Sequence, residues 1–398
     1  MTTNAGVGLS RQHNPNLAGR EAAEQALKKA GVEKPAFVFM FASIGYDQHS
    51  VLRAVREATG GAPLTGCSVE GTLDGDDADE SNFSVLVTVI SSDELRWHNG
   101  LATELSADSC ALGKRVAKDL LPHLSADTIG LFVFPDGLTY DIDNFFAGLE
   151  GDLPSERFLP IWGGGAGNNL NLGKPTYQYC DDEVVSDGIS YALLSGEARP
   201  AWAIGHSLIP IGGERIVTRS EGNVIYEIDG KPATEVLKEY LPEDALADDR
   251  DWLRYAISLA LSFRAPSYMK DEEYIVRGVP ELSLTDGSIT VQTEVKEGTS
   301  LWFSSRDKEK ITTGFDRMAA KIKEQLDGAQ PELVFQFECV TRGKLMFREQ
   351  EKLQLLKRFR QSVGPDVPWV GFYTIGEIAP VEEHNGINRF ASVLLALS

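Results

Sequence analysis

The sequence of 398 residues is long enough for two domains of ordinary size, each with a substantial core. Hydrophobic residues make up 42% and charged residues 24%, which is typical of globular proteins and excludes disordered or fibrous ones. The 59 acidic and 38 basic residues give a formal charge of −21, which disfavours binding to phosphate backbones and anionic membranes. We therefore expect neither nucleic acid nor a membrane as a partner.

Export, disulfide formation and metal binding are also not indicated. No apolar run reaches the roughly 20 residues that cross a bilayer, and residues 1–20 lack the apolar core of a signal peptide. The four cysteines are scattered without the paired spacing of disulfide frameworks or zinc sites: Cys67, Cys110, Cys180 and Cys339. No two of the six histidines have metal-ligand spacing. These features predict a reduced, cytoplasmic protein without a bound metal.

Residues that favour the start or the end of a helix occur at several points along the chain. The first helix is predicted over residues 17–30, because the glycine that follows, Gly31, is a favourable residue for ending a helix. Asp108 and Asp307 are predicted to cap the N-termini of the helices that follow them.

A repeated order of elements runs through most of the chain. Three Pro-x-x-Gly segments end at Gly66, Gly163 and Gly371. Each follows an apolar strand and then a helical stretch, and each precedes a polar loop and another apolar strand. The first strands are predicted at residues 36–42, 128–134 and 332–338, the helices at 49–59, 140–149 and 347–362, and the last strands at 83–91, 189–195 and 390–397.

This recurrence is one of pattern and not of identity, so it indicates either an internal repeat or the ordinary alternation of an α/β fold. Both interpretations predict parallel pairing through right-handed crossovers, with ligands at the carboxyl ends of the strands. Between residues 200 and 305 the pattern changes to hairpin-like strands with a helix after Pro232. These strands are predicted at residues 215–219, 223–229, 273–278 and 288–296.

The predicted fold class is therefore α/β, with two α/β halves built from repeated strand–helix–strand units and mixed sheets. A small-residue and proline break at residues 196–200 marks the expected domain boundary, which gives domains of residues 1–199 and 200–398. The acidic stretch at residues 242–251 is predicted to be a solvated connector.

Four groups of motifs, taken in order, resemble the FIST sensory family. The segment GGGAG at residues 163–167 resembles the N-terminal region of that family. The other motifs resemble the C-terminal region of the family. They are VTRSEGN with YEIDGKPA at 217–233, FECVTRG at 337–343, GFYTIGEIAP at 371–380, and His384 with Asn385. Each motif alone is a weak signal, but their joint order is specific.

The resemblance implies a sensory module for a small ligand, with amino acids as the leading expectation and a signalling protein as a possible partner. It also implies haem as an alternative, with His206 or His384 as the axial ligand. The sequence has no CxxCH motif and no cysteine followed by proline. We therefore expect no cofactor.

The first candidate binding residues are Gly164 and Gly165. A glycine turn can present backbone amides to an anionic group. The same turn is also compatible with tight packing of a strand against a helix. A nucleotide-binding loop is the third interpretation, although the acidic ribose partner is missing from the sequence.

Cys339 and Arg342 follow a predicted buried strand, where polar side chains would face a crevice. The guanidinium fork suits a ligand carboxylate, or Arg342 instead pairs internally with Glu338 or Glu377. An alternative interpretation is an enzyme with a cysteine nucleophile. The nucleophile would be Cys339, with His384 as its base, or Cys67. The segment GCSVEG at residues 66–71 resembles a nucleophile elbow, but its last glycine is one position too far from the serine.

Glu377 is a charged residue in a mostly apolar segment, so it either pairs with a cation or contacts a ligand amine. His384 and Asn385 could hydrogen-bond a ligand, and Asn385 also suits a turn. The sequence thus predicts no catalytic residue and a binding site formed by Gly164, Gly165, Cys339, Arg342, Glu377, His384 and Asn385.

Overall fold

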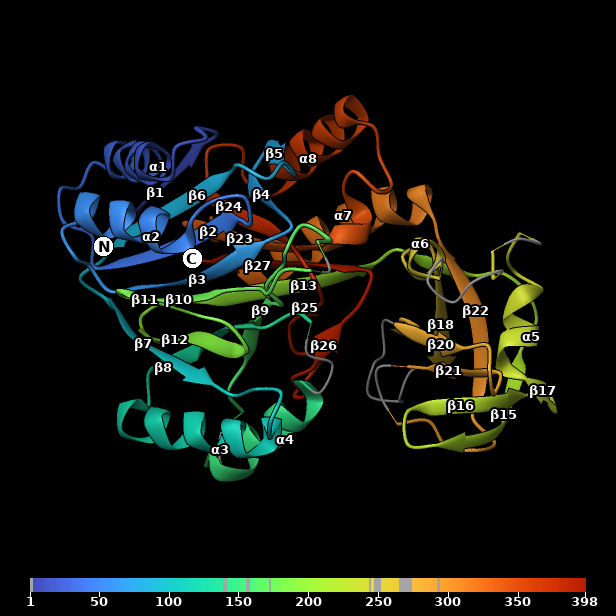
Figure 1. Ribbon diagram of the computed structural model, residues 1–398. Helices are drawn as coiled ribbons and strands as arrows, with labels where there is room; N and C mark the ends of the chain where they lie inside the picture. Colours follow the sequence, from blue (N-terminus) through green and yellow to red (C-terminus); the bar gives the residue numbers. More distant parts are fainter. Residues whose placement is uncertain are drawn as a thin grey trace. The chain divides into compact units, whose positions relative to one another are not determined.

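A computed structural model describes residues 3–138, 142–154, 158–171, 173–242, 245–246, 252–264, 274–291 and 294–398. Most of the acidic stretch predicted as a connector lies outside these residues. Among the described helices, none is both long and apolar enough to cross a membrane. The fold is mixed α/β with several mixed sheets, as predicted (Figure 1).

The chain divides into two compact units. Unit 1 comprises Met1–Gly205, Thr312–Ile387 and Ala391–Ser398, and unit 2 comprises His206–Ile311 and Asn388–Phe390. Unit 2 is therefore an insertion, which follows strand β13 (Pro200–His206) in the chain. The domain boundary expected at residues 199–200 stays a prediction.

Unit 1 contains three six-stranded sheets that share one strand order, and this order reveals an internal repeat. The first sheet has the order β1 (Asn4–Ser10), β6 (Val85–Ser91), β2 (Phe37–Ser43), β3 (Leu64–Val69), β10 (Gln178–Cys180) and β11 (Glu183–Val185). The second has the order β7 (Leu95–Thr103), β12 (Gly188–Gly196), β8 (Thr128–Pro135), β9 (Ile161–Gly164), β25 (Glu377–Ile378) and β26 (Ile387–Asn388). The third has the order β13, β27 (Ala391–Leu397), β23 (Leu333–Cys339), β24 (Trp369–Thr374), β4 (Gly71–Asp74) and β5 (Asp77–Asp79).

The predicted parallel crossovers are confirmed in all three sheets. Strand β2 pairs in parallel with β3, β8 with β9, and β23 with β24. The connecting helices are α2 (Gln48–Ala58), α4 (Ile142–Asp152) and α8 (Glu349–Val363). A further helix lies between the first two strands of each repeat: α1 (Pro15–Ala30), α3 (Ser109–Leu120) and α7 (Lys308–Leu326).

The recurring Pro-x-x-Gly segments have a steric cause. Each proline directly precedes the third strand of its repeat, and each glycine lies beside the parallel strand. A Cβ atom would lie 1.8 Å from the Met40 carbonyl oxygen at Gly66 and 1.9 Å from the Val133 carbonyl oxygen at Gly163. Only glycine allows the two backbones to come this close.

The three repeats exchange strands in a closed cycle. Strand β4 of the first repeat pairs with β24 of the third, and β25 of the third pairs with β9 of the second. Strand β10 of the second repeat completes the cycle by pairing with β3 of the first. Each sheet of unit 1 is therefore finished by a hairpin from another repeat, so no repeat is complete by itself.

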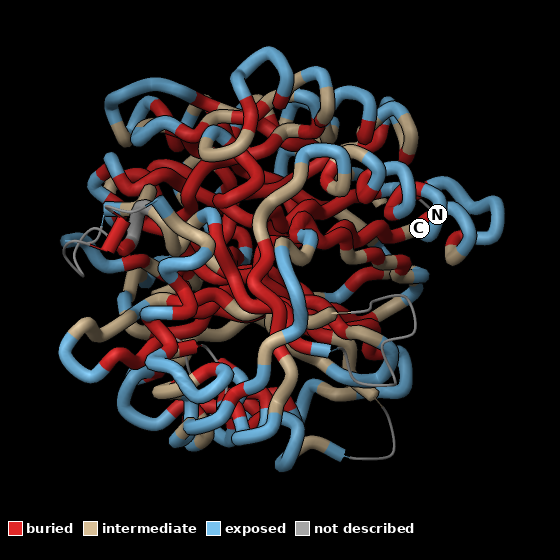
Figure 2. The backbone as a smooth tube through the Cα atoms, turned by 90° about the vertical axis from the view of Figure 1, so that its right-hand side faces the viewer, coloured by how far each residue is buried: buried red, intermediate tan, exposed pale blue. Residues whose placement is uncertain are grey.

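Three phenylalanines at matching positions of β2, β8 and β23 join the repeats. The ring centroids of Phe39 and Phe132 lie 5.3 Å apart, those of Phe39 and Phe335 5.2 Å, and those of Phe132 and Phe335 4.8 Å. All three residues are completely buried, and Figure 2 shows how buried residues concentrate inside the molecule. This aromatic contact is the centre of the largest apolar cluster in unit 1.

Helix ends follow the sequence signals. Asn14 accepts hydrogen bonds from the backbone of Asn16 and Leu17, so α1 begins two residues before its predicted start. Gly31 ends α1 with a left-handed φ of 68°, as predicted. Asp108 and Asp307 cap the helices that follow them, with hydrogen bonds of 2.8 and 2.6 Å.

Unit 2 is a nine-stranded sheet with its own apolar cluster. Strands were predicted in each of its four hairpin segments, and the structure places β15 (Arg215–Glu221), β16 (Val224–Ile228), β19 (Tyr274–Arg277) and β21 (Ser288–Thr290) there. Its other strands are β14 (Leu208–Pro210), β17 (Lys231–Pro232), β18 (Leu259–Arg264), β20 (Glu281–Ser283) and β22 (Ser300–Arg306). The helix predicted after Pro232 is α5 (Ala233–Lys238), and a short helix α6 (Leu253–Ala256) follows.

The aromatic contact between repeats predicts a large effect of truncation. Phe132→Ala should lower the free energy of unfolding by about 3–5 kcal/mol, because it leaves a cavity where three sheets meet. Leu17→Ala is the matched control, since Leu17 is 55% exposed and its loss should cost no more than about 0.5 kcal/mol. Urea unfolding of both variants measures the difference, and equal shifts would contradict a core centred on Phe132.

Candidate functional site

The carboxyl ends of the parallel strands in unit 1 bring several predicted site residues together. Gly164 pairs with Glu377 across β9 and β25, and Cys339 pairs with Thr374 across β23 and β24. A Cβ atom at Gly164 would lie 2.6 Å from the Thr374 methyl group, which joins the two pairs. Gly164, Cys339 and Glu377 thus share one edge of unit 1.

Glu377 is completely buried and its carboxylate is hydrogen-bonded inside the protein. Oε1 accepts a hydrogen bond of 2.6 Å from the Thr374 hydroxyl, and Oε2 accepts one of 3.1 Å from the Ala391 amide. These bonds link the end of β24 to the start of β27. Direct contact between Glu377 and a ligand stays a prediction.

The glycine turn after β9 packs tightly against neighbouring backbone. The amides of Gly165, Ala166 and Gly167 donate to the carbonyls of other segments, at 2.8 to 2.9 Å. A Cβ atom at Gly165 would lie 2.4 Å from the Ile375 carbonyl oxygen. The geometry therefore fits the tight-turn interpretation, because these three amides are already occupied.

Arg342 lies in a short 3₁₀ turn, Val340–Arg342, at the end of β23, and its side chain is completely buried. Nε donates to Oε1 of Glu338 at 2.5 Å, and Nη1 donates to the Gly205 carbonyl at 2.8 Å. The ion pair between Arg342 and Glu338 is the internal alternative predicted for this arginine. Nη2 is buried and has no hydrogen-bond partner within the described part of the chain.

The two candidate cysteines, Cys67 and Cys339, are both buried. Burial raises the pKa of the Cys67 thiol well above its usual value, so the thiol stays protonated. Cys339 is buried and its sulfur accepts a hydrogen bond of 3.1 Å from the Thr341 hydroxyl. His384, the base suggested for Cys339, is exposed in the turn after β25, where its backbone pairs with Val381.

Asn385 lies at the opposite end of β9 from Gly164. Its side chain donates to Glu150 at 2.8 Å and to the Leu159 carbonyl at 2.9 Å, and it accepts from the Ile161 amide at 2.9 Å. These bonds anchor the hairpin of the third repeat to the start of β9. Since three residues of a strand span about 10 Å, Asn385 is not grouped with Gly164, and ligand contact by His384 and Asn385 stays a prediction.

Sequence reasoning missed Glu70, which directly follows β3 at the same edge as Gly164. Oε1 of Glu70 accepts a hydrogen bond of 2.7 Å from the Asn168 amide, and the amides of Asn169 and Leu170 also point to this carboxylate. The anion in the amide cradle after the glycine turn is thus the protein's own Glu70. Oε2 of Glu70 is buried and has no partner among the residues that are described.

Burial raises the pKa of the Glu70 carboxyl to about 7, against the lowering effects of the Asn168 amide and of the Lys344 charge. The signal that could have found Glu70 is an acidic residue directly after a buried strand, the argument used for Glu377. It lies in the segment GCSVEG, which was considered only as a nucleophile elbow.

A second missed group ties the first repeat to the third. Glu80 accepts a hydrogen bond of 2.6 Å from Nζ of Lys352, and both side chains are 3% exposed. Oε1 and Oε2 of Glu80 also accept from the Lys344 amide, at 2.9 and 2.8 Å. Nζ of Lys344 donates to the side chain of Asn169 at 2.8 Å, so this group reaches the loop that holds Glu70.

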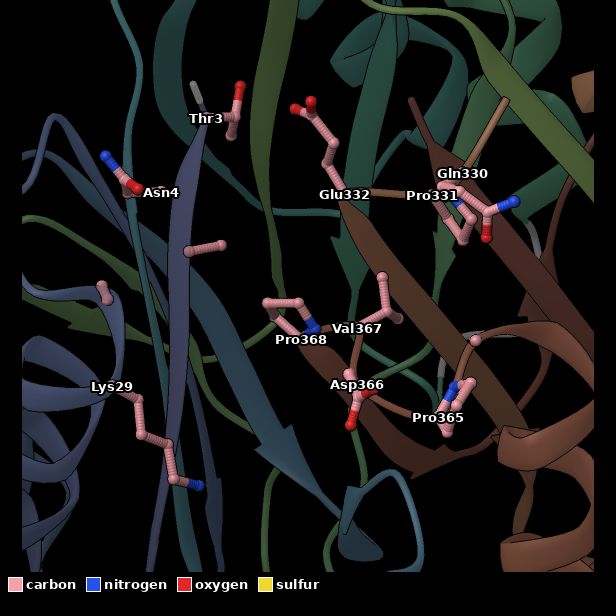
Figure 3. Close-up of a pocket in the computed structure, with 13 residues that line it drawn as sticks. Thr3, Asn4, Lys29, Gln330, Pro331, Glu332, Pro365, Asp366, Val367 and Pro368 are labelled. Carbon is pink, nitrogen blue, oxygen red and sulfur yellow. The ribbon is translucent and has the colours of Figure 1, made fainter. Parts of the chain in front are cut away.

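A cavity of about 440 Å³ lies at the other ends of the strands, where β1, β23 and β24 begin (Figure 3). Its lining includes Lys29, Glu332 and Asp366, with prolines between the polar groups. A smaller cavity of about 200 Å³ is lined mainly by apolar residues next to β8, among them Leu124 and Phe158. Neither cavity is lined by a histidine, so neither fits haem with His206 or His384 as axial ligand.

In the chain as described, no three His, Cys, Asp or Glu side chains gather in a way that could hold a metal ion.

Two family models together match most of the chain. The FIST N domain matches residues 36–231 and the FIST C domain matches residues 233–380. The motifs at residues 217–233 were predicted to lie in the C-terminal region, and this prediction is wrong, because the N domain extends to residue 231. The chain belongs to the FIST family. FIST domains are sensory domains that bind small ligands.

Known proteins are similar to this chain over most of its length. An uncharacterized protein of Mycobacterium tuberculosis is 25% identical over 408 residues, which covers 97% of each chain. An uncharacterized protein of Methanocaldococcus jannaschii is 28% identical over 317 residues, which covers 74% of this chain and 58% of that protein. Among solved structures, a chorismatase aligns with a TM-score of 0.39 and 11% identity over 100% of this chain and 99% of that one.

The raised pKa of Glu70 predicts a pH-dependent stability in this FIST protein. The folded carboxyl has a pKa of about 7 against 4.5 for an ordinary glutamate, so the folded state binds the proton more tightly. Its contribution is complete below the unfolded pKa and is lost as the pH rises through 7, by about 3 kcal/mol in total. Glu70→Gln should remove this loss, so urea unfolding at pH 5 and pH 8 should show a smaller decrease than wild type. The same decrease in both proteins would contradict a raised pKa at Glu70.

The buried pair of Lys352 and Glu80 predicts a second stability effect. Burial lowers the pKa of Lys352, but its hydrogen bonds to Glu80 and Glu349 raise it overall above the usual value. Lys352→Met should lower the free energy of unfolding by about 3–5 kcal/mol, because it leaves a buried carboxylate without its cation. Arg96→Met is the control and should have a far smaller effect, since Arg96 and Asp127 are 62% and 44% exposed. If both variants melt at the same temperature, the buried pair does not hold the repeats together.

Proposed function

We propose that this FIST protein is a cytoplasmic sensor that binds an amino acid, without a cofactor, and passes the signal to a protein partner. The binding site in this proposal is the carboxyl-end edge of unit 1, which we define by Glu70, Gly164, Gly165, Asn168, Cys339, Arg342 and Glu377. Family membership supports the sensory role and the small ligand.

The observation that carries the proposal is the uncommitted Nη2 group of Arg342. A buried donor without an acceptor costs about 1–3 kcal/mol, and more for a charged group, so this position favours an acceptor from outside the chain. The bonds of Nε to Glu338 and of Nη1 to Gly205 hold the guanidinium in one orientation. A ligand carboxylate would accept a charge-assisted hydrogen bond from Nη2 without reorganising the arginine.

The glycine turn favours a carboxylate ligand over a nucleotide. Phosphate loops hold their ligand with several free backbone amides. Here the amides of Gly165, Ala166 and Gly167 donate to carbonyls, and the next amide, at Asn168, donates to Glu70. The arrangement therefore supports recognition by side chains and not by a phosphate-binding loop.

Arg342→Lys is the variant that tests the proposal. Lysine keeps a cation beside Glu338 but cannot present the fixed donors of a guanidinium. Removing one charge-assisted hydrogen bond should weaken amino-acid binding by about 1.5–3 kcal/mol, which is roughly 10- to 150-fold. Isothermal titration calorimetry with the twenty amino acids measures the change, and Arg96→Lys, at an exposed position, is the matched control.

Arg342→Ala is less informative, because it leaves Glu338 buried without its cation and should destabilise the protein by about 3–5 kcal/mol. Thermal melts of each variant therefore accompany the titrations. If Arg342→Lys binds every amino acid as tightly as wild type does, Arg342 is structural and the proposed site is wrong.

A further inference from the structure

The second sheet of unit 1 ends in the long edge strand β7. It has nine residues, whereas the corresponding edge strands β1 and β13 of the other two sheets have seven each. β7 pairs with β12 on one side and is the last strand in the order of its sheet (Figure 1). An edge strand whose N–H and C=O groups are unpaired is a template for pairing with a further strand.

A hydrogen bond at the end of β7 shows which of its backbone groups point away from β12. The Glu104 amide donates to the Asp187 carbonyl at 2.8 Å, so the even-numbered residues of β7 face β12. Because successive residues of an antiparallel strand alternate between its two sides, the backbone groups of Trp97, Asn99 and Leu101 point outward. In the part of the chain that the structure describes, these groups form no hydrogen bond, and all three residues are partly exposed.

The edge strands of the other two sheets are protected by glutamine side chains from neighbouring helices. Gln25 of α1 accepts a hydrogen bond of 3.2 Å from the outward Leu9 amide of β1. Gln325 of α7 bonds to both outward groups of Trp202 in β13, at 3.0 and 2.8 Å. Covering an edge in this way is a common protection against unwanted strand pairing.

The side-chain contacts of the β7 edge lie at its two ends. The Leu95 amide donates to the Ser92 hydroxyl at 3.2 Å, and the Thr103 carbonyl accepts a hydrogen bond from Arg115 of α3. The middle of β7 therefore presents an open edge to an extended chain.

A second copy of β7 supplies the groups that this open edge lacks. Surfaces related by a two-fold axis are self-complementary, and two β7 strands pair in antiparallel when their outward residues lie opposite each other. A two-fold axis at Gly100 places Asn99 opposite Leu101 and Trp97 opposite Thr103. The two Gly100 residues then meet on the axis as a non-hydrogen-bonded pair, whose Cα atoms approach to about 4.5 Å.

Charge favours this register, centred on Gly100, over its neighbour. It places Arg96 of one copy beside Glu104 of the other at both ends of the ladder, and such opposite charges stabilise an antiparallel pair. Both side chains are exposed, at 62% and 72%. A register centred on Asn99 instead places Glu94 beside Glu104, which is destabilising. We propose that two copies of this chain associate through β7, in antiparallel pairing centred on Gly100.

Other charges of the chain modulate this association without preventing it. Arg96 also pairs with Asp127, and Glu104 with Arg115, but both ion pairs are exposed and contribute little. The formal charge of −21 on each copy opposes association at long range. At physiological salt this repulsion is screened beyond about 8 Å, whereas the hydrogen bonds of the ladder persist.

Leu101→Pro tests the pairing. The Leu101 amide points away from β12, so proline removes a donor to the second copy and no hydrogen bond within its own sheet. The two-fold axis doubles the loss to two hydrogen bonds, which should weaken the dimer by roughly 5- to 150-fold. Leu101→Ala is the matched control, because it removes the side chain and keeps the amide. Analytical ultracentrifugation at physiological salt measures the dissociation constants, and thermal melts show whether each variant folds.

Charge reversal tests the register. Arg96→Glu and Glu104→Arg each place like charges beside one another at both ends of the ladder, so each should weaken the dimer by roughly 2- to 30-fold. The double variant brings opposite charges together again and should recover the affinity of wild type.

Three results would overturn the proposal. Wild type that sediments as a monomer at every concentration shows that the β7 edge does not pair with itself. A dimer that survives in folded Leu101→Pro uses another surface. If the double charge reversal dimerises as weakly as the single reversals, the copies do not meet in the register centred on Gly100. Should Leu101→Pro fail to fold, the charge variants decide alone.

Discussion

The contact between Phe39, Phe132 and Phe335 is the constraint on which the structure of unit 1 depends. Each ring comes from the second strand of a different repeat, and the next inward residues Phe41 and Phe134 also touch. Phe39 contacts Phe132, and two residues further along each strand Phe41 contacts Phe134. Strands β2 and β8 therefore run in the same direction where they pack against each other. The exchanged hairpins then pair each repeat with the next, which gives three sheets one common edge at the carboxyl ends of their strands.

This closure explains why the polar groups at the edge find their partners in other repeats. Glu70 of the first repeat is held by amides of the second, and Glu80 of the first repeat pairs with Lys352 of the third. These hydrogen bonds hold the loops in place. Nη2 of Arg342 and Oε2 of Glu70 are buried and have no hydrogen-bond partner among the described residues. Buried polar groups are almost always hydrogen-bonded in proteins, and these two atoms at the edge depart from that rule in the chain as described.

The elements of the repeat were predictable, because they depend on local pattern. Apolar runs, helix caps and the Pro-x-x-Gly segments each reflect a nearby cause, such as the close backbone approach at Gly66. The partners at the edge were not predictable, because Glu70 and Asn168 are 98 residues apart and Glu80 and Lys352 are 272 residues apart. A local pattern also does not show which end of a strand a loop reaches, which is why Asn385 was grouped with Gly164.

The central claim is that ligand binds at the carboxyl-end edge of unit 1, and hydrogen–deuterium exchange with an equimolar mixture of the twenty amino acids tests it most directly. The account predicts slower exchange of the amides in segments 164–171 and 338–344, with unchanged exchange in α3 (Ser109–Leu120), which contributes no residue to the site. The same segments should remain unprotected in a variant that combines Arg342→Lys with Glu70→Gln. Unchanged exchange at both segments, or protection confined to residues around the cavity at the opposite strand ends, would contradict the account.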